Sequence, residues 1–344
     1  VKQSQFRVFG VTTIIIALIT YCMAPIVATQ PSWFYVMVVV TVLLLTELKH
    51  TFTEFAQRMK NDEMITLAKF LAISGIILPM LPHKNLIPDI NLTPYSIWLA
   101  TVVVSGISYL SYLLKRYVFH ESGTLVSGII GGLYSSTATI SVLARKSRKA
   151  SEQEATDYVA AMLLAVSMMF LRFMILILIF SREIFLSIYP YLLTMAVVAA
   201  IVAWFIHSRQ KRPEDQSAET EEDDSSNPLE FKVALIFAVL FVIFTFLTHY
   251  TLVYAGTGGL NLLSFVSGFS DITPFILNLL QNTGSVAALI ITACSMQAII
   301  SNIMVNMFYA LFFAGKGSKL RPWILGGFGV VIACNLVLLL FFYI

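Results

Sequence analysis

The chain has 344 residues, of which 58% are hydrophobic and 12% are charged, and its mean hydropathy is +0.83. These values exclude a soluble globular domain, and many apolar runs approach the roughly 20 residues that are needed to cross a bilayer. The net charge of +3 gives no reason to expect a nucleic-acid partner. The composition therefore predicts an all-α polytopic membrane protein whose first partner is the lipid bilayer.

Catalytic and metal-binding motifs are not found in the sequence. It has no CxxC, HExxH, GxxxxGKS/T or GxSxG pattern, and the five histidines do not have the spacing of metal ligands. Cys22, Cys294 and Cys334 all lie in apolar runs, which is typical of small buried residues rather than of a disulfide framework. We therefore expect no enzymatic activity and no cofactor.

Apolar windows in chain order predict nine spanning helices, at 8–28, 33–48, 64–81, 96–118, 155–180, 184–207, 230–254, 285–314 and 322–344. Two weaker windows, 123–145 and 258–281, are rich in Gly, Ser and Thr. Of the connectors, 47–63 is predicted to be an amphipathic surface helix and the acidic segment 209–228 a mobile loop. The first span has no cleavage site and no initiator Met precedes it, so we expect no signal peptide and further residues upstream.

Positive charge predicts how the two weaker windows meet the membrane. If all eleven windows span, the Lys and Arg residues of the connectors divide about 11 inside to 9 outside, which fits the positive-inside bias poorly. If each weaker window enters and leaves on one side, 18 of the 22 Lys and Arg residues lie in the cytoplasm and only Lys84 and Arg182 lie outside. We therefore predict nine spanning helices, two re-entrant broken-helix hairpins and a cytoplasmic N-terminus.

The weaker windows also predict an inverted repeat. LVSGIIGGLYSSTATISVL (125–143) aligns with LNLLSFVSGFSDITPFILN (260–278), and the alignment pairs Ser136 with Asp271. In each half a span, a hairpin and two further spans follow one another, and the predicted topology inverts the second half. The predicted regions are 1–48, a connector with the third span at 49–95, the first repeat unit at 96–207, an acidic cytoplasmic loop at 208–229 and the second repeat unit at 230–344.

Breaks at membrane depth predict a binding site. Non-helical backbone is tolerated there only where protein buries it or where it lines a watery cavity, and paired interruptions in two halves mark the central site of many transporters. Helix starts attract anions, whereas unwound carbonyls attract cations, so the sign of the substrate stays open. Close helix packing by small residues is the alternative for both segments. The predicted substrate-binding residues are Gly131, Gly132, Ser135, Ser136, Thr137, Ser270, Asp271, Thr273, Asn302 and Asn306.

Away from their ends, the predicted membrane segments contain one acidic residue, Asp271, and one arginine, Arg172, besides Lys69. Ionisable groups at that depth are costly and usually functional. We expect Asp271 to bind substrate or carry a proton, and to ligate the metal if the substrate is a cation. Arg172 is the expected charge partner, and a purely structural pair stays an alternative. Asn302 and Asn306, one turn apart, either complete the polar lining or hydrogen-bond between helices.

The string SGIIGGLYSSTATISVLARKSR (127–148), with VVVSGISYLSYLLKR (102–116) and VSGFSDITP (266–274), carries a family resemblance. It resembles the C-terminal module called domain of unknown function 4010 in bacterial MgtC/SapB-type membrane proteins, over about 45–344, and 1–48 resembles the tail of the MgtC-like domain. The resemblance implies a bacterial inner-membrane protein associated by name with magnesium homeostasis, and it supplies no transport reaction. It also implies a Lys where this chain has Asn306.

Together these features predict a secondary transporter or ion permease for a small inorganic ion, and Asp271 slightly favours a cation. A regulatory MgtC-like protein that binds another membrane complex is one alternative, and an ion/proton antiporter, by analogy alone, is another. The expected partners are a small ion or solute, with a second copy of the chain or another membrane protein as open alternatives.

Overall fold

A computed structural model describes residues 11–32, 34–44, 61–87, 90, 92–119, 123–148, 152–209, 231–281, 287–315 and 318–343. The chain forms two compact units, 1–65 and 66–344. Most of the predicted surface helix at 47–63 and most of the predicted acidic loop at 209–228 lie outside the described residues.

In the first unit, α1 (Val11–Thr29) is followed by a second helix, Phe34–Leu44. A turn in which the Phe34 amide donates to the Pro31 carbonyl separates them. These helices take the place of the predicted spans 8–28 and 33–48. Their described apolar stretches have fewer than 18 residues, so their crossing of a membrane stays a prediction.

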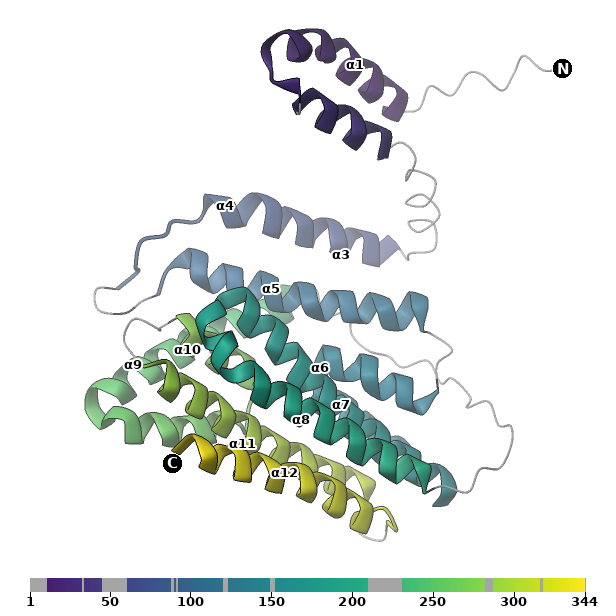
Figure 1. The fold of residues 1–344 in the computed structure, drawn as a ribbon, viewed down its shortest axis with the longest axis vertical. Coiled ribbons are helices and arrows are strands. Elements are labelled where there is room, and N and C mark those ends of the chain that lie inside the picture. The colour runs from purple at the N-terminus through teal and green to yellow at the C-terminus, as the bar shows by residue number, and fades with distance from the viewer. Residues whose placement is uncertain are drawn as a thin grey trace, which may run out of the picture. The chain divides into compact units, whose positions relative to one another are not determined.

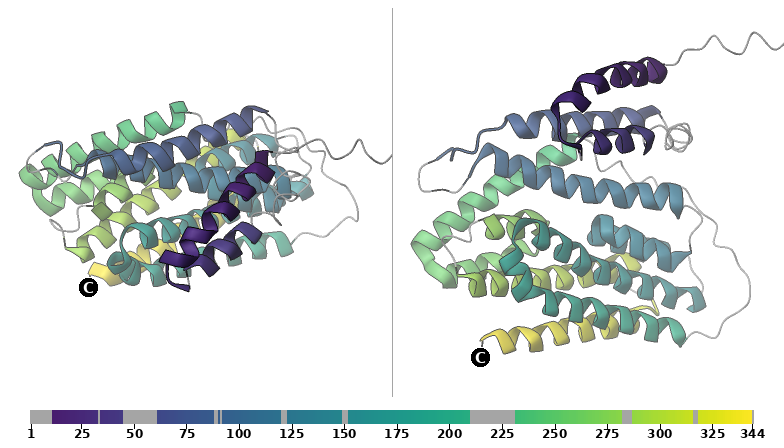
Figure 2. Two further views of the ribbon diagram at one scale, coloured as in Figure 1. Left: turned by 90° about the horizontal axis from the view of Figure 1, so that it is seen from above. Right: turned by 45° about the horizontal axis from the view of Figure 1, so that its top comes forward.

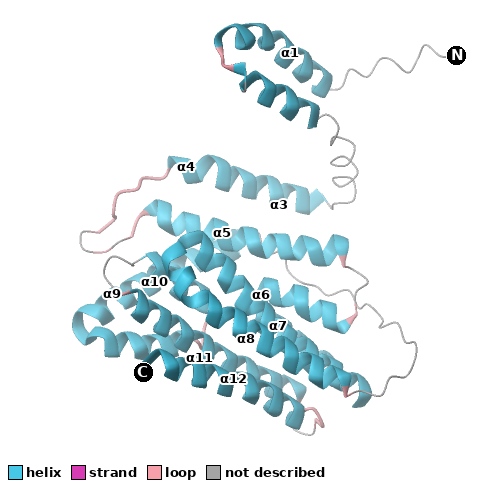
Figure 3. Cartoon of the chain, in the orientation of Figure 1, coloured by secondary structure: helices cyan, strands magenta, loops and turns pink. Residues whose placement is uncertain are grey.

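The second unit is a helical bundle (Figures 1 and 2), and among the described residues the structure contains helices and loops but no strand (Figure 3). α3 (Asn61–Ala72), which begins just before this unit, runs through a π-helical turn, Ile73–Ile77, into α4 (Leu78–Met80). The carbonyl of Ile73 accepts from the Leu78 amide in the π turn and also from Trp98 Nε1 at 3.1 Å. The longer helices that follow are α5 (Pro94–Leu113), α6 (Thr124–Lys146), α7 (Glu152–Phe180), α8 (Arg182–Ser208), α9 (Phe231–Ser267), α10 (Ile272–Gln281), α11 (Ala288–Ala314) and α12 (Arg321–Tyr343).

Eight helices in the described part of the chain are long and apolar enough to cross a membrane. This confirms the prediction of a polytopic helical membrane protein. α7 and α11 form the centre of the bundle, because 50% of the 156–180 span and 67% of the 288–314 span are buried, more than in any other of the eight. Both helices therefore lie where they can line a site.

α6 is long enough to span but reverses direction at Ser135, whose backbone is extended (φ −158°, ψ 106°). A Cβ added at Gly131 would lie 2.5 Å from Thr139 Oγ1, whereas residues eight apart in a continuous helix are separated by about 12 Å. Residues 124–146 therefore form a helical hairpin, which we call the first hairpin, and Ser135 is its break.

α9 also reverses, at Gly256, which has φ 60° and ψ −152°. Only glycine adopts this conformation at little cost. A Cβ added at Gly259 would lie 2.8 Å from Thr251 Cγ2, again across eight residues. The half-helix 257–267 then leads through a second break, 268–271, into α10. We call 257–281 the second hairpin.

The two hairpins lie toward opposite ends of the bundle (Figures 1 and 2). α5 ends and α7 begins at the end where the first hairpin lies, on the right of Figure 1. The second hairpin lies at the other end, where α11 begins. The two ends of each hairpin therefore lie at the same end of the bundle.

Candidate functional site

The first break is stabilised by the serine at its centre. Ser135 Oγ accepts a hydrogen bond from the Ala138 amide at 3.3 Å, which makes Ser135 the N-cap of the second half-helix, 136–146. An extended residue with a short hydroxyl side chain is the preferred N-cap, since it satisfies one of the amides that the first turn leaves unpaired. Ser135, Ser136 and Thr137 were predicted to bind substrate, and of these three Ser135 caps the half-helix.

Glycines press the first hairpin against α7. A Cβ at Gly132 would lie 2.5 Å from Ala165 Cα, and one at Gly128 would clash with the backbone of Ala161. The two glycines are four residues apart on the hairpin, and the two alanines are four residues apart on α7. Small residues therefore face each other along both helices and let the backbones come into contact, as is common in closely packed membrane helices. Gly131 is turned toward the other half of the hairpin, against Thr139.

The second break uses a carboxylate cap. Asp271 Oδ1 accepts from the Thr273 amide at 3.0 Å at the start of α10. Asp271 itself is exposed, as is Ser270, whose Oγ donates to the Ser267 carbonyl at 3.1 Å, whereas Thr273 is buried. Pro274 is the third residue of α10, which begins at Ile272. Its missing amide falls in the first turn, where no intrahelical partner exists.

The second hairpin packs against α11 through polar contacts. A Cβ at Gly268 would lie 2.8 Å from the backbone nitrogen of Asn302. Asn302 Nδ2 donates to the Gly268 carbonyl at 3.2 Å, and Ser301 Oγ donates to the Phe265 carbonyl at 2.7 Å. These two side chains hold the carbonyl end of the half-helix 257–267, and Ser301 is a site residue that the sequence analysis missed. Its position next to Asn302 was the available signal.

The contacts of the two hairpins can be matched residue by residue. This matching differs by one residue from the sequence alignment. Gly132 against Ala165 matches Gly268 against Ser301, and at the same chain separation the N-cap Ser135 matches the N-cap Asp271. The alignment had paired Ser136 with Asp271. Side-chain similarity favoured that pairing, whereas backbone approach and capping fix the observed one.

Arg172 on α7 connects the two breaks. Its Nη1 donates to the Tyr134 carbonyl, directly before the first break, at 2.8 Å. It also interacts electrostatically with Asp271 in the second break. Each of these two charged groups hydrogen-bonds to backbone rather than to the other, since Asp271 accepts from Thr273. The buried Nε of Arg172 has no hydrogen-bond partner.

Asn306 lies deeper along α11. Its Nδ2 donates to Asn302 Oδ1 at 3.2 Å, so the two side chains form a relay that ends on the Gly268 carbonyl. The Oδ1 of Asn306 is buried and has no partner. Both asparagines therefore hydrogen-bond between or along helices, and one acceptor is left over.

The end of α11 near the first hairpin is held by one arginine in the last turn of that hairpin and one just after it. Arg148 Nη2 donates to the Phe312 carbonyl at 3.2 Å, Arg148 Nε donates to the Phe313 carbonyl, and the Arg145 guanidinium lies 4.4 Å from the Phe313 ring centroid. Donors at a helix C-terminus satisfy its last carbonyls and favour its dipole. We call Arg145 and Arg148 the arginine clamp.

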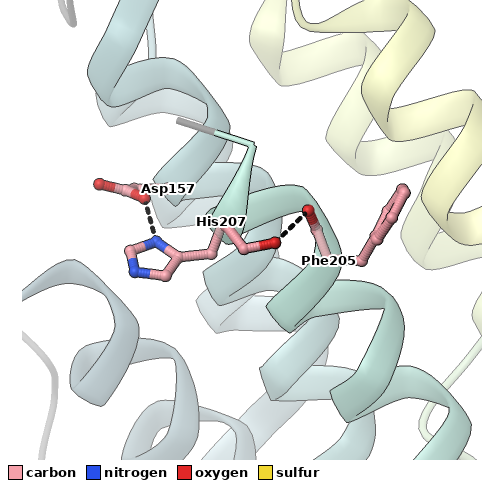
Figure 4. A network of polar contacts seen from close by, with 4 residues as sticks. Asp157, Phe205 and His207 are labelled. Carbon is pink, nitrogen blue, oxygen red and sulfur yellow. Dashed lines mark hydrogen bonds and ion pairs between the residues drawn. The ribbon is translucent and has the colours of Figure 1, made fainter. Parts of the chain in front are cut away.

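Two further polar features lie away from the breaks. Asp157 near the start of α7 faces His207 near the end of α8, with Oδ1 and Nδ1 2.6 Å apart (Figure 4). A cavity of about 400 Å³ lies beside the start of α5 and the end of α10, lined by residues that include Ser96 and Gln281. Neither includes a predicted site residue. In the described part of the chain, no three His, Cys, Asp or Glu side chains gather as a metal site would require.

Comparison with known proteins places both hairpins within one family match. A family model described as "Domain of unknown function (DUF4010)" matches residues 102–314. An uncharacterized protein of Aquifex aeolicus (strain VF5) is 25% identical over 227 residues, which cover 64% of this chain and 96% of that protein. No solved structure matches. The family match contains both breaks, Arg172 and Asn302, and its description assigns no activity.

Proposed function

We propose that this chain, which belongs to the family described as domain of unknown function 4010, is a secondary transporter or ion permease for a small inorganic ion. The ion binds between the first and second breaks. The observation that carries this proposal is the position of Arg172, which hydrogen-bonds to the carbonyl before the first break and interacts electrostatically with Asp271 in the second. A half-buried arginine in a membrane helix that hydrogen-bonds at one interrupted helix and interacts electrostatically with a second is typical of a binding site.

The arrangement of the hairpins supports the proposal. Each is preceded by one long helix and followed by two, and they lie at opposite ends of the bundle (Figure 1). We propose that the two halves are inverted repeats and that both hairpins are re-entrant. With the positive charge of the connectors, this gives a multi-pass protein of a bacterial inner membrane with a cytoplasmic N-terminus.

Packing alone accounts for less of what is observed. Gly128 and Gly132 explain the close contact of the first hairpin with α7, but a packed pair of helices has no need of Arg172 or of two helix starts inside the bundle. A charged side chain at that depth is costly unless it has a role. The breaks and the charge together therefore favour transport over packing.

Purified protein in liposomes that enclose ion-sensitive dyes tests the proposal. We expect flux of at least one of sodium chloride, sodium sulfate, sodium phosphate or magnesium chloride, and loss of that flux in Arg172→Gln. Arg182→Gln is the matched control, because Arg182 is an exposed arginine at the start of α8. Monodisperse protein that moves none of these salts would overturn the transport assignment.

The MgtC/SapB resemblance supports a competing proposal, a regulatory protein that binds another membrane complex. Large apolar side chains of α1, such as Leu18 and Tyr21, are exposed and suit either lipid or a membrane-protein partner. In that case the breaks serve packing only, no salt is transported, and deletion of residues 1–48 abolishes the association. Flux that survives this deletion would favour the transporter.

A further inference from the structure

Arg172 has a donor that the protein does not use. A guanidinium carries five N–H donors and no acceptor. Nη1 uses the Tyr134 carbonyl, whereas Nε is buried and unpartnered. Leaving a buried donor of a charged group without a hydrogen bond costs free energy, so we expect an acceptor atom at this position.

The neighbouring acceptors are already engaged by the protein. The Tyr134 carbonyl accepts from Arg172, and the Gly268 carbonyl accepts from Asn302. The Asp271 carboxylate, which favoured a cation in the sequence, accepts from the Thr273 amide. Carbonyls and carboxylates that hold N–H groups offer fewer lone pairs to a cation, so the breaks are poorer cation sites than their composition indicates.

A second positive feature lies next to the same carbonyl. The half-helix 136–146 begins two residues after Tyr134, and its first turn directs amides toward the break. The side chain of Ser135 takes only the Ala138 amide. A helix start carries about half a positive charge and commonly binds anions. The buried Nε of Arg172 is an independent indication of a ligand at this place.

We infer that the ion bound at the breaks is a small inorganic anion, held by Arg172 Nε and by the amides that open the half-helix 136–146. This inference rests on the proposed transport function and assigns the charge of its substrate. Asp271 opposes the bound anion from the second break, which limits its affinity and favours its release, as transport requires.

The leftover acceptor on α11 does not change this assignment. Asn306 Oδ1 is unpartnered, but Asn306 lies one helical turn beyond Asn302, about 6 Å farther along α11 than the residue that contacts the second break. It is a neutral amide oxygen, and a water molecule that accompanies the anion satisfies it. The charged, unpartnered donor decides the sign.

Thermal unfolding of the full-length protein in detergent tests the inference. Sodium gluconate serves as the reference salt, and chloride, nitrate, sulfate or phosphate replaces gluconate at constant sodium concentration. At least one of these anions should raise the Tm by about 2–4 °C at saturation. Arg172→Gln and Arg172→Lys should lose the shift, because neither keeps the Nε–H donor, and Arg182→Gln should keep it.

Asp271→Asn separates the two signs of charge even if the Arg172 variants do not fold. The asparagine still caps Thr273 but removes the negative charge, so an anion should bind with equal or severalfold higher affinity. A cation would lose most of its affinity. A Tm shift that follows Na⁺ or Mg²⁺ and disappears in Asp271→Asn would overturn the anion inference and leave transport intact.

The flux measurement distinguishes the remaining outcomes. Anion-dependent stabilisation without flux supports the anion site and overturns the transport function. An absence of stabilisation by every salt, with flux present in the same preparation, overturns the anion site at these residues. An absence of both overturns both.

Discussion

The first hairpin breaks at Ser135 alone and packs by glycine against the alanines of α7. The second hairpin breaks over 268–271 and packs by one glycine against polar residues of α11. At the first break, a charged side chain, Arg172, donates to the Tyr134 carbonyl directly before the break. At the second, a neutral side chain, Asn302, donates to the carbonyl of Gly268, where the break begins. The caps differ in the opposite sense, neutral Ser135 and charged Asp271.

This difference shows how similar backbones acquire different chemistry. At the breaks, each hairpin with its following helix contributes one charged side chain. Arg172 comes from the following helix of the first hairpin, whereas Asp271 comes from the second hairpin itself, and the two have opposite sign. The backbone requirements, a capped helix start and a held carbonyl end, are met in both. Predictions can therefore separate what the backbone needs from what the charges add.

The largest expected effect concerns the sidedness of the two hairpins. Single cysteines in a background without native cysteines, at Lys146 at the end of the first hairpin and at Lys84 before α5, should react oppositely with an impermeant reagent added outside intact cells. Lys84→Cys should label fully and Lys146→Cys should not label until the membrane is opened. Outside labelling of Lys146→Cys would mean that α6 crosses the membrane, and would end the comparison of two hairpins.

Backbone contact in the first hairpin should give the next largest effect. Gly132→Ala places a methyl group 2.5 Å from Ala165 Cα, and backbone atoms cannot move aside as a flexible side chain does. We expect a loss of about 2–3 kcal/mol in unfolding free energy, measured by denaturant titration in detergent.

Gly326→Ala is the matched control for this substitution. Gly326 is also helical, and its added Cβ meets no atom within 4 Å. It should change stability by about 0.5–1 kcal/mol in the favourable direction, through helix propensity. Equal effects of the two substitutions would show that the first hairpin is not held by close backbone contact.

A double-mutant cycle on the two charges sharpens the comparison further. If Arg172 and Asp271 formed only a structural pair, removing one would cost about 3–5 kcal/mol and removing both would restore stability. Because each hydrogen-bonds to backbone, we expect Arg172→Gln to cost about 1–3 kcal/mol and Asp271→Asn, which keeps the cap, to cost less than about 0.5 kcal/mol.

The double mutant should then be additive within about 0.5 kcal/mol. Unfolding free energies of the wild type, the two single mutants and the double mutant give the coupling directly. Recovery of stability in the double mutant would restore the interpretation of a purely structural ion pair, and the charges would lose their place in the proposed site.

Much of the fold was predictable, because long apolar runs indicate membrane helices and small polar residues within them indicate breaks. The windows 123–145 and 258–281 correspond closely to the hairpins 124–146 and 257–281. The turn at Gly256 lies between the predicted span 230–254 and the second window. These features depend on local composition and on glycine, both of which a single sequence contains.

The site was less predictable, because its partners are backbone atoms. The sequence indicated Arg172 and Asp271 as a pair but could not show that Arg172 donates to Tyr134 and that Asp271 accepts from Thr273. Every residue has the same carbonyl and amide, so no sequence pattern marks the ones that are used. The register of the two hairpins was misaligned by one residue for the same reason.

The arginine clamp should give a small and local effect, and it tests whether the first hairpin supports the half of the bundle that contains the second. Arg148 donates to the carbonyls of Phe312 and Phe313 at the end of α11. Arg148→Ala should therefore cost about 1 kcal/mol and increase amide exchange in the last turn of α11, while the start of α11 is unchanged. Arg182→Ala, which removes an exposed arginine from the start of α8, is the control and should alter neither quantity. If both variants leave the exchange of 310–314 unchanged, the clamp contributes nothing in solution.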